Sequence, residues 1–190
     1  TAGDIQEVFL VLRGGEAPPG QRPEMLGGVI GANSAKIQNV NNKATVTGSN
    51  TSSGSAVGGI IGQNLSGGYV FNLVNSANVT ASKYDQVAGL IGLNQGTLKN
   101  SFSTGNVTAK SQVGGVVGQN TGTIVNTYNN GTIKGSSTYV GGVVGYANSG
   151  TIKYTYYLDT SAKDGNSVTQ RGIGNATLGS TTGDITDKTE

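Results

Sequence analysis

The sequence predicts an all-β protein that folds as a parallel β-helix (β-solenoid) of about five rungs, a rung being one complete turn of the coil. The first observation is a glycine-rich unit that recurs between residues 25 and 158. The second is that the apolar segments of each unit are rich in β-branched residues and shorter than the ~10–12 residues expected of a helix. The third is that the length differences between copies fall in Ser-, Thr- and Asn-rich stretches, as is typical of solenoid repeats.

The most regular part of the unit is a Gly-Gly-aliphatic-aliphatic-Gly segment, which we expect to form the first of three strands in each rung. Successive copies of its second glycine are 31, 30, 26 and 27 residues apart, at Gly28, Gly59, Gly89, Gly115 and Gly142. Either of the two adjacent aliphatic positions could face the interior. The internal ladder is therefore Val29/Ile60/Leu90/Val116/Val143 or its neighbour Ile30/Ile61/Ile91/Val117/Val144.

Two more apolar ladders follow in each unit. Stacked parallel rungs place equivalent strands ~4.8 Å apart, so that each rung covers the apolar side chains of the next. The second ladder is Ile37/Val70/Leu98/Ile124/Ile152, and the third, nine residues further along, is Val46/Val79/Val107/Ile133.

An asparagine recurs two residues after the second-ladder aliphatic, at Asn39, Asn72, Asn100 and Asn126. Asn tolerates the left-handed backbone region, and stacked Asn side chains can bond one another. We therefore expect these residues to shape the coil rather than to bind a ligand.

An aromatic ladder is expected four residues after the second-ladder aliphatic, where Phe102, Tyr128 and Tyr156 stand. Aromatic stacking adds ~0.5–1.5 kcal/mol to burial, so we expect these rings to stack in the core. Tyr139 and Tyr146 are instead the candidate exposed aromatic residues for contact with a sugar ring.

Residues 114–133, GGVVGQNTGTIVNTYNNGTI, resemble the GLUG motif, and the resemblance extends over residues 25–158. GLUG repeats occur in bacterial surface and secreted proteins, including adhesin-like proteins and the non-catalytic regions of IgA1-type metallopeptidases. The resemblance implies a β-solenoid segment of a larger cell-surface protein. It does not imply peptidase activity, because the HExxH motif of such peptidases needs two His residues and this chain has none.

The flanks depart from the motif. Residues 1–24 are expected to be an N-terminal cap or linker, with residues 8–12 covering the first rung, and residues 159–190 a C-terminal cap or linker. The sequence ends at Glu190 without an obvious terminator, which suggests a cut from a longer chain.

Composition argues against several classes of function. The 190 residues include no Cys or His, and between residues 25 and 158 the only acid is Asp85. Disulfides, zinc sites, imidazole bases and paired carboxylates are therefore not expected on the solenoid, and we predict no catalytic, cofactor-binding or metal-binding residues. A net charge of +2 is not the footprint of a nucleic-acid binder. The longest apolar run, residues 8–12, is far shorter than the ~20 residues of a membrane-spanning helix.

These observations predict a non-catalytic solenoid module, and the resemblance to the GLUG motif implies that it belongs to a bacterial surface or secreted protein, located outside the cell or on its surface. It would act as a stalk or spacer, or as an adhesive surface for a host protein or a glycan. One alternative is a carbohydrate-active β-helix enzyme or a glycan-binding module. A remote alternative is ice binding, for which Thr45, Thr47, Thr80, Thr108 and Thr132 lie beside the third ladder, although Asn78, Asn106 and Lys134 interrupt them.

Overall fold

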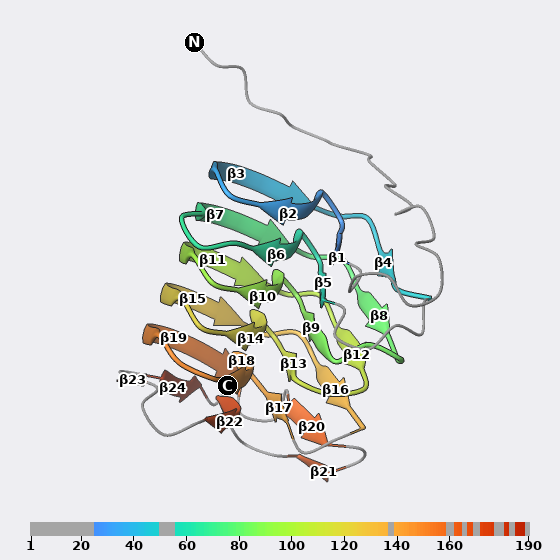
Figure 1. Cartoon of the computed structure of the whole chain (residues 1–190). Helices are drawn as coiled ribbons and strands as arrows, with labels where there is room; N and C mark the ends of the chain where they lie inside the picture. The colour runs from blue at the N-terminus through green and yellow to red at the C-terminus, as the bar shows by residue number, and fades with distance from the viewer. Residues whose placement is uncertain are drawn as a thin grey trace.

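The computed structural model describes residues 25–49, 56–136, 139–158, 162–164, 167–168, 172–176, 181–182 and 185–188. Every regular element in these residues is a β-strand, and strands of successive rungs pair in parallel (Figure 1). The single antiparallel pair among them is β20 with β21. The predicted parallel β-helix of about five rungs is confirmed. The N-terminal cap predicted for residues 1–24 lies outside the described residues.

The strands form four sheets, which we label A to D in the order in which each rung visits them. Sheet A contains β1 (Met25–Gly27), β5 (Ala56–Gly58), β9 (Gln86–Ala88), β13 (Val113–Gly114) and β17 (Val140–Gly141). Sheet B contains β2 (Ile30–Asn33), β6 (Ile61–Asn64), β10 (Ile91–Asn94), β14 (Val117–Asn120), β18 (Val144–Ala147) and β22 (Ile173–Ala176).

Sheets C and D complete each rung. Sheet C contains β3 (Lys36–Asn42), β7 (Tyr69–Asn75), β11 (Thr97–Ser103), β15 (Thr123–Asn129), β19 (Thr151–Leu158), β23 (Thr181–Thr182) and β24 (Ile185–Lys188). Sheet D contains β4 (Val46–Thr47), β8 (Val79–Ala81), β12 (Val107–Ala109), β16 (Ile133–Gly135), β20 (Ala162–Asp164) and β21 (Ser167–Val168).

A rung therefore has four strands, and the prediction of three is wrong. The Gly-Gly-aliphatic-aliphatic-Gly segment is not one strand but the corner between sheets A and B. In the second rung, β5 ends at Gly58 and β6 begins at Ile61, so that Gly59 and Ile60 make the corner. At this corner both adjacent aliphatic side chains point inward, and Ile60 and Ile61 are both completely buried. The two ladders offered as alternatives are both internal.

The interior divides into two apolar clusters. The first is built from residues of sheets B and C and their corners, and holds both first ladders and the second: Ile60, Ile61, Val70, Leu73, Leu90, Ile91, Leu98, Val116, Val117, Ile124, Val143, Val144, Ala147, Ile152 and Tyr157. The second is built mainly from residues of sheets A and D, and holds the third ladder: Val46, Val57, Val79, Ala81, Tyr84, Val87, Val107, Ala109, Val113, Ile133 and Val140. It also contains a ladder that the sequence analysis missed, made by the aliphatic residue directly before each glycine pair.

Buried asparagines link the rungs where sheet B leads into sheet C. Asn33 Nδ2 donates to Asn64 Oδ1 at 2.8 Å, Asn64 Nδ2 to Asn94 Oδ1 at 2.9 Å, and Asn94 Nδ2 to Asn120 Oδ1 at 2.8 Å. We call these four residues the buried Asn column. Because each amide is both donor and acceptor, the column satisfies polar groups that burial would otherwise leave unpaired.

The second glycine of each pair makes room for a buried side chain at the opposite corner, between sheets C and D. A Cβ on Gly59 would lie 2.7 Å from Nδ2 of Asn75, and would also collide with the backbone oxygen of Gly89. Asn75 is fully buried, and its Nδ2 donates to the carbonyl of Ala77 at 2.8 Å. Glycine is therefore required at position 59, because any Cβ there would lie too close to Asn75 and to the backbone of Gly89.

Replacing Gly59 by Ala is expected to lower the free energy of unfolding by about 1–3 kcal/mol, because the new methyl group overpacks a buried corner. Urea denaturation followed by circular dichroism measures the change. Ser66→Ala, in an exposed turn of the same rung, is the control and should shift stability by no more than about 0.5 kcal/mol. Equal stability of the Gly59 variant and wild type would contradict this packing.

The parallel ladders continue past residue 158. Strand β20 pairs with β16, β22 pairs with β18, and β23 and β24 both pair with β19. Part of the segment predicted as a C-terminal cap or linker therefore extends the sheets.

Candidate functional site

The long strands of sheet C present the most distinctive outward surface, and its geometry depends on one backbone feature. Asn39, Asn72, Asn100 and Asn126 have positive φ angles of 58°, 55°, 48° and 54°. Side-chain bonds join them in pairs: Asn72 Nδ2 donates to Asn39 Oδ1 at 3.0 Å, and Asn126 Nδ2 to Asn100 Oδ1 at 2.8 Å. The predicted left-handed, stacked asparagines are confirmed, with Tyr154 at the same position in the fifth rung.

The left-handed residue changes which later side chains point inward. In β15, Ile124 is buried, Val125 and Asn126 face outward, Thr127 is buried and Tyr128 is exposed. Without the left-handed residue, simple alternation would place Tyr128 on the same side as Ile124. The extra outward position moves Tyr128 to the outside instead.

The prediction that the aromatic ladder lies in the core is therefore wrong. Phe102 and Tyr128 do stack, with ring centroids 4.7 Å apart and planes 5° from parallel, but they do so on the outer face. Among the described residues, the large hydrophobic side chains that are exposed all belong to sheet C: Tyr69 at 38%, Tyr128 at 41% and Tyr154 at 51%. Tyr156, in register with Tyr128, is half-buried.

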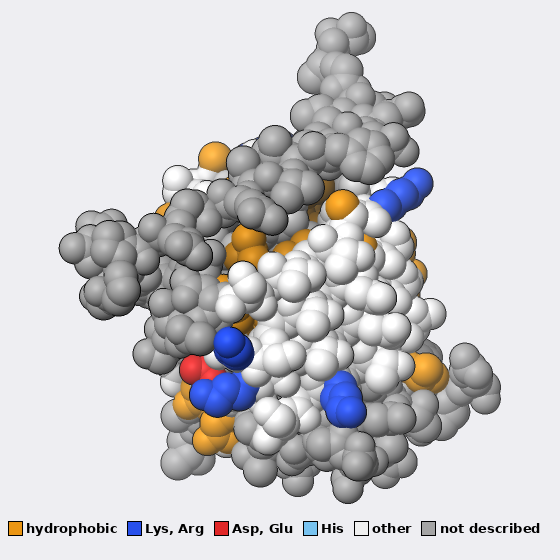
Figure 2. All heavy atoms as spheres, turned by 90° about the vertical axis from the view of Figure 1, so that its right-hand side faces the viewer, with side chains coloured by type: hydrophobic (Ala, Val, Ile, Leu, Met, Phe, Trp, Pro, Cys, Tyr) orange, Lys and Arg blue, Asp and Glu red, His pale blue; other side chains and the backbone are white. Residues whose placement is uncertain are grey.

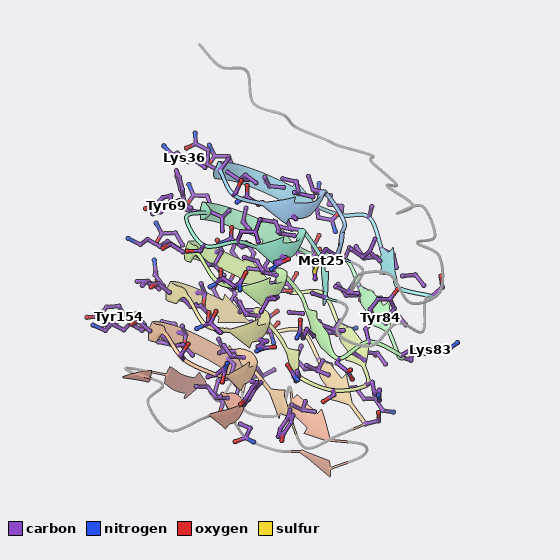
Figure 3. The ribbon with its side chains drawn as sticks, in the orientation of Figure 1. Met25, Lys36, Tyr69, Lys83, Tyr84 and Tyr154 are labelled. Carbon is purple, nitrogen blue, oxygen red and sulfur yellow. The ribbon has the colours of Figure 1, made fainter. Side chains whose placement is uncertain are left out.

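Lysines are interleaved with these rings. The ammonium of Lys36 lies 5.3 Å from the ring centroid of Phe71, and that of Lys99 lies 5.5 Å from the ring centroid of Tyr69. Figure 3 shows Lys36, Tyr69 and Tyr154 projecting on one side of the molecule, away from the interior. With Lys153, the five long strands of sheet C in the first five rungs carry three lysines and no acidic residue. We call this surface the aromatic–lysine face.

The two tyrosines singled out by the sequence are brought together elsewhere. Tyr139, directly before β17, stacks on Tyr146 of β18, with centroids 5.6 Å apart and planes 21° from parallel. The Tyr146 hydroxyl donates to Asn148 Oδ1 at 3.4 Å. Both tyrosines are half-buried, so they offer a smaller surface than the rings on sheet C.

Sheet D presents a different surface. Thr47, Thr80 and Thr108 lie in register there, followed by Lys134. In the neighbouring column, Asn78 and Asn106 accept bonds from backbone N–H groups of the next rung, at 3.1 and 2.9 Å. Figure 2, which views this side, shows a mainly uncharged surface on which basic side chains lie in a few places, in one of them beside an acidic side chain. The threonine array considered for ice binding is thus a short column bounded by a lysine.

Acidic, Cys and His side chains do not cluster in the described part of the chain. Asp85 Oδ1 lies 3.4 Å from Lys110 Nζ, so these two side chains form an ion pair. Nowhere in the described residues do three acidic, Cys or His side chains gather where they could hold a metal ion. Nor do those residues include a helix of the length and apolarity needed to cross a bilayer.

The fold and the surface together define a parallel β-solenoid with an aromatic, basic outer sheet. Comparison of the chain with family models, with curated proteins and with solved structures finds no match.

Proposed function

We propose that this chain is a non-catalytic β-solenoid module of a bacterial surface or secreted protein, acting as a stalk or spacer or as an adhesive surface. The observation that carries this proposal is that the repeated residues of each copy contact the equivalent residues of the next copy. Three features repeat in each copy: the glycine pair, the aliphatic ladder residues and the asparagines. They pack or bond against the same features of the next copy. The repetition therefore serves to extend a structure of constant cross-section.

The chemistry that the chain places along this structure supports the same proposal. Hydrolysis or elimination on a polysaccharide generally needs clustered carboxylates, or a carboxylate-bound metal with a base. Residues 25–158 supply one carboxylate, Asp85, and it is paired with Lys110. The location outside the cell, the bacterial source and the membership of a larger chain rest on the resemblance to the GLUG motif.

Two measurements test the proposal. Antibodies against the purified chain should label intact, unpermeabilised cells of the source organism or detect the protein in the medium; labelling only after permeabilisation would overturn the location. The purified chain, incubated with a panel of neutral and acidic polysaccharides, should release neither reducing ends nor unsaturated sugars. Turnover above the level of a heat-denatured sample would instead support a carbohydrate-active enzyme.

A further inference from the structure

We propose that the aromatic–lysine face binds an extended acidic polysaccharide that lies along the solenoid axis and carries about one anionic group per disaccharide. This inference names a ligand class for the adhesive role and so rests on the proposed function.

The lysines of this face come from every second rung and stand in two columns: Lys99 and Lys153 share a register position through Val125, whereas Lys36 lies two residues earlier, in register with Tyr69. Lys36 lies in β3 of the first rung, Lys99 in β11 of the third and Lys153 in β19 of the fifth. At ~4.8 Å per rung, the backbone positions of Lys99 and Lys153, two rungs apart in one column, are separated by about 10 Å along the axis. That interval is comparable to the disaccharide repeat of an extended glycan, so anionic groups on successive disaccharides would meet Lys99 and Lys153, with Lys36 to one side of this line.

The aromatic residues occupy the space between these charges. Tyr69 and Phe71 of the second rung contact each other edge to face, with centroids 5.7 Å apart, and lie beside the ammonium groups of Lys99 and Lys36. Such cation–π contacts hold an ammonium near the sheet while leaving its N–H donors able to bond an anion. The exposed Tyr128 and its stacked neighbour Phe102 provide apolar surface for the C–H face of a sugar ring.

The charge of the face selects the occupant. A second copy of the chain packed face to face would bring like charges together, whereas an anionic chain is attracted to every lysine. The exposed asparagines that run between the lysines and the outer aromatic ladder add amide groups within reach of sugar hydroxyls.

The experiment measures binding of the full chain, residues 1–190, by isothermal titration calorimetry at low and at physiological salt. The probes are hyaluronan fragments, which carry one carboxylate per disaccharide, keratan sulfate fragments, which carry sulfate instead, and carboxyl-reduced hyaluronan as the uncharged control. We expect salt-dependent binding to at least one acidic probe, and the two acidic probes distinguish carboxylate from sulfate. Equal affinity for carboxyl-reduced hyaluronan, or no binding to either acidic probe, would overturn the inference.

Matched variants locate the site. Replacing Lys36, Lys99 and Lys153 together by Gln should weaken binding by about tenfold or more, because each lysine loses a charge-assisted bond. Replacing Lys43, Lys83 and Lys134 by Gln makes the same change in net charge. Because these lysines lie outside sheet C, this variant should alter affinity by less than about twofold. Tyr128→Ala should weaken binding about threefold to tenfold through loss of stacking.

Both triple lysine variants should keep the wild-type thermal midpoint, since their side chains face solvent, whereas Tyr128→Ala should lower it slightly through loss of the stacking on Phe102. Equal losses in the two triple variants would show a general effect of charge and overturn the placement on sheet C. Degradation of an acidic probe during the titration would overturn the proposed non-catalytic function itself. Absence of binding without degradation would overturn this inference alone and leave the spacer role standing.

Discussion

Val107→Asp is expected to unfold the solenoid or to lower its free energy of unfolding by several kcal/mol. Val107 lies in β12, is completely buried, and is in register with Val79 of the preceding rung and Ile133 of the following rung. The apolar cluster around it contains Val, Leu, Ala, Ile and Tyr side chains and no described cation to pair with a carboxylate. Denaturation in urea, followed by circular dichroism, measures the loss.

The position of Val107 in the array enlarges the expected effect. The stability of a solenoid depends on the interfaces between neighbouring rungs. Val107 belongs to the third of five rungs, so the new charge disturbs two interfaces and separates the N-terminal rungs from the C-terminal ones. We therefore expect the transition to become broader or to disappear, rather than simply to move to a lower urea concentration.

The adjacent residue provides a matched control. Thr108 follows Val107 in the same strand but points outward, in register with Thr80 and Lys134. Thr108→Asp places the same charge beside a lysine across the strand and should change stability by less than about 1 kcal/mol. Comparable destabilisation by both substitutions, or a Val107→Asp protein that melts like wild type, would contradict the inward assignment.

Most of the coil could be predicted because its strongest signals are local and repeated. The fixed nine-residue offset between the second and third ladders gives the observed register, in which Ile37 pairs with Val70 and Val46 with Val79. The number of strands per rung could not be predicted in the same way. A pair of aliphatic residues between glycines is as compatible with a short strand as with a corner. Only the corner directs both Ile60 and Ile61 inward.

The missed ladder did have a signal in the sequence. An aliphatic residue directly precedes each glycine pair, or Ala88-Gly89 in the third copy, and it forms the interior side of sheet A. These residues are Leu26, Val57, Val87, Val113 and Val140. Each belongs to a strand of only two or three residues, too short to show a period of two.

The outward position of the aromatic ladder was not predicted, for a related reason. The left-handed asparagines were predicted, but the change that they cause in the direction of the following side chains was not. A single left-handed residue shifts the alternation by one position, and a shift of one position exchanges the two faces of a strand. The ladder of Phe102 and Tyr128 is therefore outside, and the outer face of sheet C, rather than Tyr139 and Tyr146 alone, presents the main aromatic surface.

Asn94→Ala is expected to lower the free energy of unfolding by about 2–4 kcal/mol, because it breaks the buried Asn column in its middle. Asn94 is completely buried, accepts a bond from Asn64 Nδ2 at 2.9 Å and donates to Asn120 Oδ1 at 2.8 Å. Truncation removes both bonds to the column, leaves Asn120 Oδ1 without this donor and opens a cavity. Chemical denaturation of the full chain measures the loss.

Two further variants separate the contributions to this effect. Asn33→Ala, at the first position of the column, loses one bond to the column instead of two and should cost about half as much. Asn94→Leu keeps a similar side-chain volume without the amide, and we expect it to remain destabilised by about 1–3 kcal/mol, because the amides of Asn64 and Asn120 each lose a partner. If Asn94→Leu were as stable as wild type, the column would act by filling space, and hydrogen bonding between its amides would not be what holds successive rungs in register.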